Sequence, residues 1–252
     1  MQIAIIGSGN IATQLGLAFI ISGHNINYVF SKNDLHKKVL AKKLKCKAAG
    51  SINEIQSDVI IIAVNDNAIP KVALQLKGND AIIAHTSGSV NMNVLKHLKK
   101  YGVIYPLQTI NKIRKVEFRS VPLCIEGNNK QVEKILLQLA SSISGNIYQL
   151  NSEQRLHVHL AAVIANNFSN HLFALSESYL KAHNLSFDLL KPLIKTTADN
   201  ITTTSPALNQ TGPAKRNDTK TIKQHLDLLA ENPELKAIYK LISASIRKEY
   251  NK

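Results

Sequence analysis

Tryptophan is absent from this 252-residue sequence, and cysteine, methionine and arginine are rare, at two, two and five residues. The two cysteines, Cys46 and Cys124, are far apart and outside any C-x-x-C pattern, so neither a disulfide framework nor a metal site is supported. No apolar run approaches the length of a membrane span. A glycine-rich turn at residue 7 interrupts the first apolar run, which is unlike a signal peptide. We therefore expect a cytoplasmic protein with no membrane partner.

Acidic residues are also scarce, because 17 Asp and Glu stand against 31 Lys and Arg, a net charge of +14. Such an excess is typical of proteins that bind nucleic acids. However, only five of the basic residues are Arg, the residue that reads bases and phosphates bidentately. Seven lysines lie between Lys32 and Lys47. We interpret this local charge as favouring a phosphorylated small molecule, and we expect no nucleic-acid partner.

Apolar residues make up 44% of the sequence, enough for a sizeable core. Up to residue 150, short apolar runs alternate with helical patterns, which is typical of a parallel sheet with crossover helices. This part is predicted to form strands at 2–6, 26–31, 58–64, 81–84, 103–105, 121–126 and 145–150, and helices at 11–21, from 34 onward and at 131–143.

From residue 151 onward the patterns are helical only, with helices predicted at 152–182, 186–199, 218–230 and 233–250. Ser152 and Asp218 are expected to cap two of these helices. The predicted fold class is therefore α/β, a Rossmann-type, mostly parallel sheet (residues 1–150) followed by an all-helical domain for substrate binding and dimerisation (residues 151–252).

Residues 7–12 read G-S-G-N-I-A directly after the first predicted strand and at the start of a helix. This is the context that the dinucleotide-binding fingerprint requires. The first glycine permits a tight turn, and the second lets the backbone approach the pyrophosphate, which then faces the helix N-terminus. The alternative is an ordinary strand-to-helix turn. The residues expected to hold the pyrophosphate are Gly7, Ser8, Gly9, Asn10 and Ile11.

The end of the second strand indicates which dinucleotide binds. NAD-binding proteins usually carry an acid there for the ribose hydroxyls. Here the strand leads into Ser31, Lys32 and Asn33, with no acid before Asp34. A hydroxyl, an ammonium and an amide suit the 2′-phosphate of NADP. We therefore predict NADP as the cofactor, bound by Ser31 and Lys32, although both could be solvated loop residues.

Polar loops follow three later strands, and ligands of open α/β sheets bind at these carboxyl ends. Val64 and Asn65 are expected near the ribose and nicotinamide, whereas Asp66 is expected to cap the next helix.

The loop after the next strand, H-T-S-G-S, could bind or polarise a carbonyl through His85 and Ser87, or it could be a turn that caps a helix near Val90. Tyr105 and Gln108 follow the strand after that, and could line the same site.

The long predicted helix carries a polar stripe in an apolar context, made of Arg155, His159, Asn166 and Asn170. Their spacing places them on one helical face. A polar stripe on a buried helix must be paired or must face a site. We expect His159 and Asn166 to orient the substrate in a cleft between the domains. The alternative is that the stripe braces two subunits.

These motifs together carry a family resemblance over nearly the whole chain. G-S-G-N-I-A, A-V-N-D, H-T-S-G-S, Y-P-L-Q-T, L-A-A-V-I-A-N-N-F and T-G-P-A-K-R-N-D occur in this order. The sequence resembles an uncharacterised bacterial family assigned to the NADP oxidoreductases, with a Rossmann-like domain and a C-terminal helical domain of unknown function. The wider superfamily includes pyrroline-5-carboxylate reductase and 6-phosphogluconate dehydrogenase-like enzymes, and the resemblance implies a homodimer formed through the helical domain.

In the hydroxyacid dehydrogenase branch, a catalytic lysine lies four residues before an asparagine on the interdomain helix. Ala162 and Val163 occupy the corresponding positions here. The sequence therefore predicts an NADP-dependent oxidoreductase that transfers hydride to or from a small C=O or C=N substrate, with catalytic candidates His85, Ser87, His159 and Asn166. Because the lysine is missing, the alternative is an NADP-binding sensor or regulatory protein without catalysis.

Overall fold

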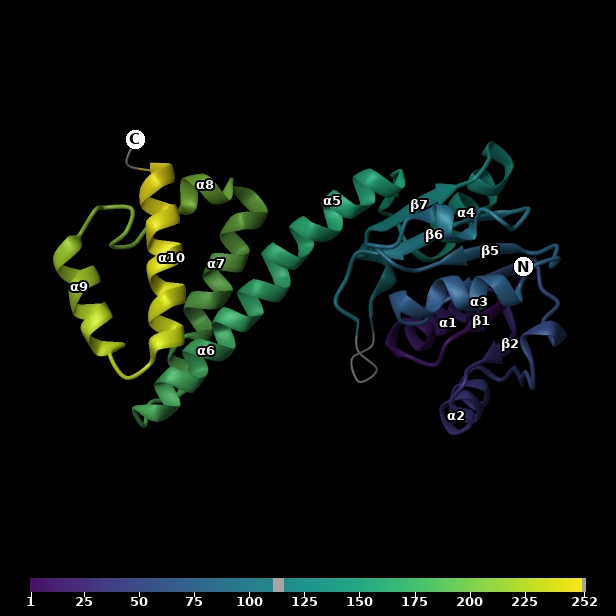
Figure 1. Cartoon of the computed structure of the whole chain (residues 1–252), viewed down its shortest axis with the longest axis horizontal. Coiled ribbons are helices and arrows are strands. Elements are labelled where there is room, and N and C mark those ends of the chain that lie inside the picture. Colours follow the sequence, from purple (N-terminus) through teal and green to yellow (C-terminus); the bar gives the residue numbers. More distant parts are fainter. Residues whose placement is uncertain (111–115, 251–252) are drawn as a thin grey trace. The chain divides into compact units, whose positions relative to one another are not determined.

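The structure is a computed structural model that describes residues 1–110 and 116–250. It comprises two compact units, Met1–Ala165 and Asn166–Lys252. The first unit holds the sheet and the helices that cover it, and the second is helical (Figure 1). The unit boundary falls fifteen residues later than the predicted domain boundary at residue 150, because the first helix after the sheet packs with the sheet unit.

The first unit is built on one eight-stranded sheet of order β3-β2-β1-β4-β5-β6-β7-β8. All neighbouring strands are parallel except β6 and β7, which are antiparallel. The strands are β1 (Gln2–Ile6), β2 (Asn25–Phe30), β3 (Lys47–Ala48), β4 (Val59–Ile62), β5 (Ile82–His85), β6 (Tyr101–Pro106), β7 (Leu123–Gly127) and β8 (Ile147–Gln149). This confirms the predicted Rossmann-type, mostly parallel sheet.

Helices cover both faces of this sheet, and each face has its own apolar core. Alternate residues of β1 point to opposite faces, so Ile3 and Ile5 join one core while Ala4 and Ile6 join the other. The first core packs against α1 (Asn10–Ile21), α2 (Asp34–Leu44) and α4 (Lys130–Ile143), and the second against α3 (Ile69–Gln75) and the 3-10 turns η1 (Ile52–Glu54) and η3 (Met92–Leu95). Two further 3-10 turns are η2 (Asp66–Ala68) and η4 (Phe118–Ser120).

The long predicted helix at 152–182 forms in three parts. They are α5 (Ser152–Ala162), a π-helical segment η5 (Val163–Phe168) and α6 (Ser169–Ala182). The unit boundary lies inside the π-helical segment. The remaining elements are η6 (Phe187–Leu189), α7 (Lys191–Thr203), α8 (Pro206–Asn209), α9 (Thr219–Leu228) and α10 (Pro233–Tyr250).

Two features of the sheet were not predicted, and one predicted helix cap is wrong. The two-residue strand β3 was not predicted, because two residues carry no periodicity. The antiparallel direction of β7 relative to β6 was not predicted, because the apolar pattern of a strand does not encode its direction. Asn151 rather than Ser152 caps α5, in a capping box with Gln154. None of the described helices combines the length and the apolar character needed to cross a membrane.

Candidate active site

The turn after β1 has the geometry that its first glycine was predicted to provide. Gly7 adopts φ of +130°, a conformation that disfavours any side chain. A Cβ atom added there would lie 2.1 Å from the carbonyl oxygen of Ala63, just beyond β4. The Gly7 amide donates a hydrogen bond to the carbonyl of Phe30 at 2.8 Å. The turn is therefore held tightly between β2 and β4.

Gly9 differs, because a Cβ atom added there would meet nothing within 4 Å. It is the N-cap of α1 and has no side chain to cap the first turn, and among the described residues no acidic residue occupies that turn. The first amides of a helix need acceptors, and an anion can supply them. The open space at Gly9 and these uncapped amides fit a dinucleotide pyrophosphate. Asn10 is tethered beside them, because its side-chain amide donates to the carbonyl of Ile110 at 2.9 Å.

The structure brings the predicted 2′-phosphate residues to the same turn. The hydroxyls of Ser8 and Ser31 are 2.9 Å apart, and Lys32 follows as an exposed side chain. Asn33, which was considered a phosphate ligand, instead caps α2 by accepting the amide of His36 at 2.9 Å. Two hydroxyls, which bond to one another, and the exposed ammonium of Lys32 therefore remain at the end of β2.

Beyond β4, Val64 is half-buried against the core and Asn65 is exposed. Asp66 does not cap the next helix, contrary to the prediction. Its carboxylate accepts a hydrogen bond from the Ser89 hydroxyl at 2.6 Å, and so joins the loops that follow β4 and β5. A side-chain partner in another loop competes with local capping, and the sequence alone cannot reveal this.

His85, the last residue of β5, is completely buried. Its Nδ1 accepts the amide of Ser87 at 3.2 Å, and its Nε2 has no partner within the described ranges. Burial, with a smaller contribution from the positive charge of Arg155, lowers the pKa of His85 to about 3. The imidazole is therefore neutral near pH 7. A buried neutral imidazole supports the loop and does not favour the predicted role of His85 in protonating a substrate.

Ser87 is also buried, and its hydroxyl oxygen accepts two backbone amides, that of Ser89 at 3.2 Å and that of Val90 at 3.0 Å. These bonds match the turn that was the structural alternative for this loop. The helix expected near Val90 is the short η3, which begins at Met92.

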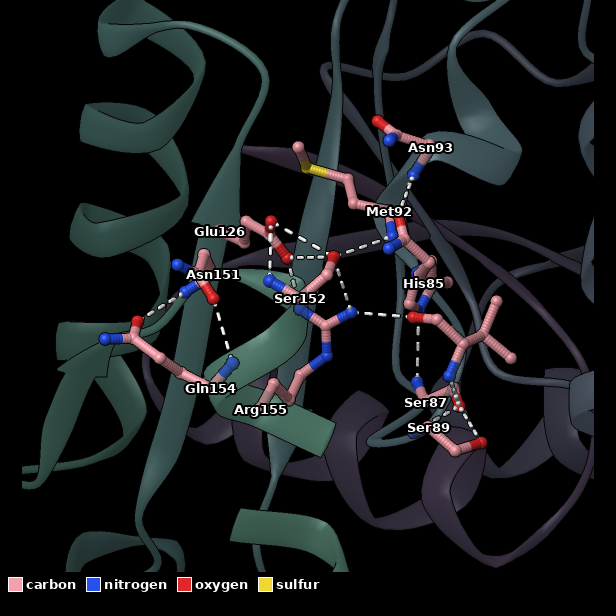
Figure 2. Close-up of polar contacts among 12 residues, drawn as sticks. His85, Ser87, Ser89, Met92, Asn93, Glu126, Asn151, Ser152, Gln154 and Arg155 are labelled. Atoms are coloured by element: carbon pink, nitrogen blue, oxygen red, sulfur yellow. Dashed lines mark hydrogen bonds and ion pairs between the residues drawn. The ribbon is translucent and has the colours of Figure 1, made fainter. Parts of the chain in front are cut away.

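Arg155 of α5 is the largest fully buried side chain, with 1% of it exposed. It forms an ion pair with Glu126 of β7 and donates to the Val90 carbonyl at 2.6 Å and the Ser152 hydroxyl at 3.2 Å. The Ser152 hydroxyl also donates to Glu126 at 2.8 Å. Figure 2 shows the guanidinium between Glu126 on one side and the loop that follows β5 on the other. Arg155 therefore joins α5, β7 and the H-T-S-G-S loop.

One turn after Arg155, His159 meets Tyr105 of β6. The distance from His159 Nδ1 to Tyr105 Oη is 3.1 Å, and the rings meet edge to face. Gly88 packs against both, since a Cβ atom there would lie 2.6 Å from Tyr105 Cζ and 2.7 Å from His159 Nδ1. Burial raises the pKa of Tyr105 to about 12.

Gly88 and Glu126 were not predicted as site residues, and the only signals for them were a glycine in a strand-end loop and a lone acid at a strand end.

Asn166 and Asn170 lie in the second unit. Asn166 is the first residue of the second unit, and both side chains are exposed. A π-helical segment changes the number of residues per turn, so the α-helical spacing used to predict one continuous stripe does not hold across it. The structure thus joins Arg155 and His159 to the sheet.

A hollow of about 1010 Å³ lies elsewhere on the first unit. Residues that line it, including Asp58, Ala81 and Lys100, precede β4, β5 and β6. Because these strands are parallel, their amino ends are opposite the glycine-rich turn. The hollow therefore does not belong to the candidate site. Within the described residues, no group of three or more His, Cys, Asp and Glu side chains could hold a metal ion.

Two family models match this chain. Residues 2–86 match the family described as NADP oxidoreductase, coenzyme F420-dependent, and residues 121–246 match the domain of unknown function DUF2520. No match to this chain is found among curated proteins.

Solved structures resemble the whole chain. A Bacteroides fragilis protein provisionally named an NADP oxidoreductase is 37% identical, with 98% of both chains covered and a TM-score of 0.91. A Thermotoga maritima protein is 26% identical, with 98% of this chain and 97% of that chain covered and a TM-score of 0.76. An imine reductase of Myxococcus stipitatus, solved with NADP⁺, shares the fold at 14% identity, with 98% and 93% coverage and a TM-score of 0.66.

Proposed function

Because the chain belongs to the family of NADP oxidoreductases that carry the DUF2520 domain, we propose that it transfers hydride between NADP and a small C=O or C=N substrate. The observation that carries this proposal is the shared edge of the sheet. The glycine-rich turn after β1 and the polar loops after β4 and β5 all lie at carboxyl ends of parallel strands.

In this proposal the cofactor is held by the turn and by the two neighbouring strand ends. The pyrophosphate binds the backbone of the turn, at Gly7, Ser8, Gly9, Asn10 and Ile11, and the open space at Gly9 supports this placement. Ser31 and Lys32 bind the 2′-phosphate, and Val64 and Asn65 lie beside the ribose and nicotinamide. When bound, NADPH supplies the hydride.

Substrate is proposed to bind beside the H-T-S-G-S loop. His85 and Ser87 shape this loop from within, since both are buried and bonded to its amides. His159 is half-buried and meets the loop at Gly88, so it can reach a substrate there. Asn166 remains a proposed orienting residue.

The test is an assay of NADPH oxidation against a panel of keto acids, aldehydes and imines, preceded by measurement of NADPH binding. We expect turnover of at least one compound class. Tight NADPH binding without turnover of any compound would favour the alternative, a sensor or regulatory protein. That alternative draws on Ala162 and Val163, which stand where related dehydrogenases carry a catalytic lysine. Absence of NADPH binding would contradict both functions.

The choice of NADP over NAD is proposed to depend on Lys32. Thermal stabilisation by a ligand grows with its concentration relative to its Kd. Lys32→Ala should therefore reduce the shift in melting temperature produced by NADPH and leave the smaller shift produced by NADH unchanged. Lys45→Ala, an exposed lysine at the other end of α2, is the matched control. Equal shifts with both cofactors in the wild type would contradict this assignment.

We also propose that the protein works in the cytoplasm as a homodimer formed through its helical unit. Both cysteines are free, which is compatible with a reducing compartment. The helical unit has little core of its own, since the only buried apolar residues among its described positions are Ala214, Ile222 and Leu229. A second copy would cover apolar side chains that are otherwise exposed.

A further inference from the structure

The polar pair formed by Tyr105 and His159 has no assigned role beyond the orientation of substrate by His159. Resting on the hydride transfer proposed above, we propose that Tyr105 is the residue that protonates the substrate, and that His159 returns the proton to Tyr105. The sheet supplies the tyrosine from β6 and the helix α5 supplies the histidine, with Oη and Nδ1 3.1 Å apart.

The position of the pair supports this role. β6 runs parallel to β5, so Tyr105 lies near the same carboxyl edge as the loop that follows β5. Gly88 of that loop lies against both rings, because a Cβ atom added to it would overlap the phenol carbon that bears the hydroxyl and the His159 Nδ1. The pair therefore lies directly against the loop proposed to bind substrate.

The surroundings keep the phenol protonated, as a proton donor must be. Burial is the main cause that raises the pKa of Tyr105, and the neighbouring Cys124 on β7 and Asp66 after β4 act in the same direction. The positive charge of Arg155, one turn before His159, acts against them. The phenol is thus neutral at pH 7 and able to donate, whereas the buried imidazole of His85 is held neutral with its Nδ1 occupied as an acceptor.

The proposed step balances in atoms and electrons. As the substrate carbon accepts hydride, the electron pair of its C=O or C=N bond moves onto oxygen or nitrogen. That atom takes the phenolic proton of Tyr105, and the phenolate oxygen takes a proton from Nδ1 of His159. Nε2 of the same ring takes a proton from water, so the ring ends with as many protons as it began. The substrate is reduced, NADPH is oxidised, and no other reactant is needed.

The test uses a substrate identified in the panel assay. Tyr105→Phe removes only the hydroxyl and keeps the ring that packs on Gly88. General acid catalysis contributes about 10² to 10⁴-fold, so kcat should fall by about that factor, with the Kd for NADPH and the melting temperature unchanged. Tyr101→Phe, on the same strand and half-buried, is the control and should keep wild-type kcat. A Tyr105→Phe kcat within about threefold of wild type would overturn the proposal.

His159 acts through Tyr105, so its test needs a readout that packing alone does not change. His159→Ala removes the ring, so kcat should fall by at least about tenfold while KM for the substrate changes little. Added imidazole should restore part of kcat in His159→Ala, because it can supply the missing ring, and should restore none in Tyr105→Phe, which lacks the hydroxyl. A His159→Ala kcat equal to that of the wild type would overturn the relay.

Failure of the proposed function gives a different result from failure of this inference. If the wild type binds NADPH but turns over no compound, hydride transfer and the donor role are overturned together. If the wild type turns over a compound and Tyr105→Phe does so equally well, only the role of the pair is overturned, and hydride transfer stands.

Discussion

The two glycines of the turn after β1 have different structural roles, although both are glycine positions of the same sequence motif. Gly7 has positive φ and no room for a Cβ atom, whereas Gly9 has an ordinary φ of −79° and open space around it. The first glycine is therefore required by the fold. The second glycine is required only by the proposed approach of the cofactor pyrophosphate to its backbone.

This difference can be tested with matched alanine variants. Gly9→Ala should unfold at the wild-type temperature without ligand, because its Cβ meets nothing. It should bind NADPH at least about tenfold more weakly, or about 1.4 kcal/mol, because the methyl group occupies the approach of the pyrophosphate. Gly7→Ala should lower the melting temperature strongly, because its Cβ overlaps the Ala63 carbonyl. Thermal melts and NADPH titrations measure both, and wild-type affinity in Gly9→Ala would contradict this placement.

His85 makes stability depend on pH. Its pKa is about 3 in the folded state, against 6.5 ordinarily, so between these values the unfolded chain binds a proton that the native protein does not. The free energy of unfolding is therefore highest above pH 6.5, where the imidazole is neutral in both states, and it decreases as pH falls toward 3.

Between pH 7 and pH 5 this group should lower the free energy of unfolding by about 2 kcal/mol. His85→Asn keeps a side-chain acceptor for the Ser87 amide and removes the titration. Urea unfolding at both pH values should therefore show a smaller pH dependence in this variant. Equal pH dependence in the two proteins would indicate that His85 titrates normally in the folded state.

At the scale of elements, α5 is attached to the sheet by a buried charge. Arg155 joins Glu126 on β7 to the loop after β5, so that His159, one turn later on the same helix, meets Tyr105. The attachment also explains why α5 belongs to the first unit rather than to the helical unit that its sequence pattern resembles.

Removing the arginine should therefore destabilise the first unit. Arg155→Met leaves the mostly buried Glu126 carboxylate with hydrogen bonds from Ser152 but without its cation. Breaking a fully buried pair costs about 3–5 kcal/mol, and the loss here should approach the lower end of that range. Lys195→Met breaks the exposed pair with Asp199 on α7 and is the control, expected to have little effect. Urea unfolding measures both. An Arg155→Met protein as stable as the control would show that the ion pair does not anchor α5.

At the scale of the whole molecule, the two units differ in how well they bury their apolar residues. The sheet unit has two continuous cores, whereas in the helical unit large side chains remain exposed. Examples are Leu189, Leu193 and Leu241, which are 66%, 63% and 73% exposed. Small units rarely remain stable with so little core unless another surface covers them.

The homodimer proposal therefore predicts a solution mass of twice 27.8 kDa by light scattering. Leu193→Asp should weaken the dimer on dilution, because it places a carboxylate on the helical surface. Val39→Asp is a control of similar exposure (60%) on α2, outside the helical unit, and should not weaken it. A wild-type protein that stays monomeric at micromolar concentration would contradict the proposal.

Local chemistry alone determined much of this protein. Apolar runs and caps predicted β1 and α10 at their observed bounds, and the glycine-rich turn indicated the cofactor, because each depends on residues close in the chain. The direction of a strand and the bonds between residues far apart in the chain leave no such local patterns. The antiparallel β7, the bond from Ser89 to Asp66 and the burial of His85 therefore emerged only from the fold. Tyr105 and His159, 54 positions apart, meet only because the sheet and α5 pack together at Gly88.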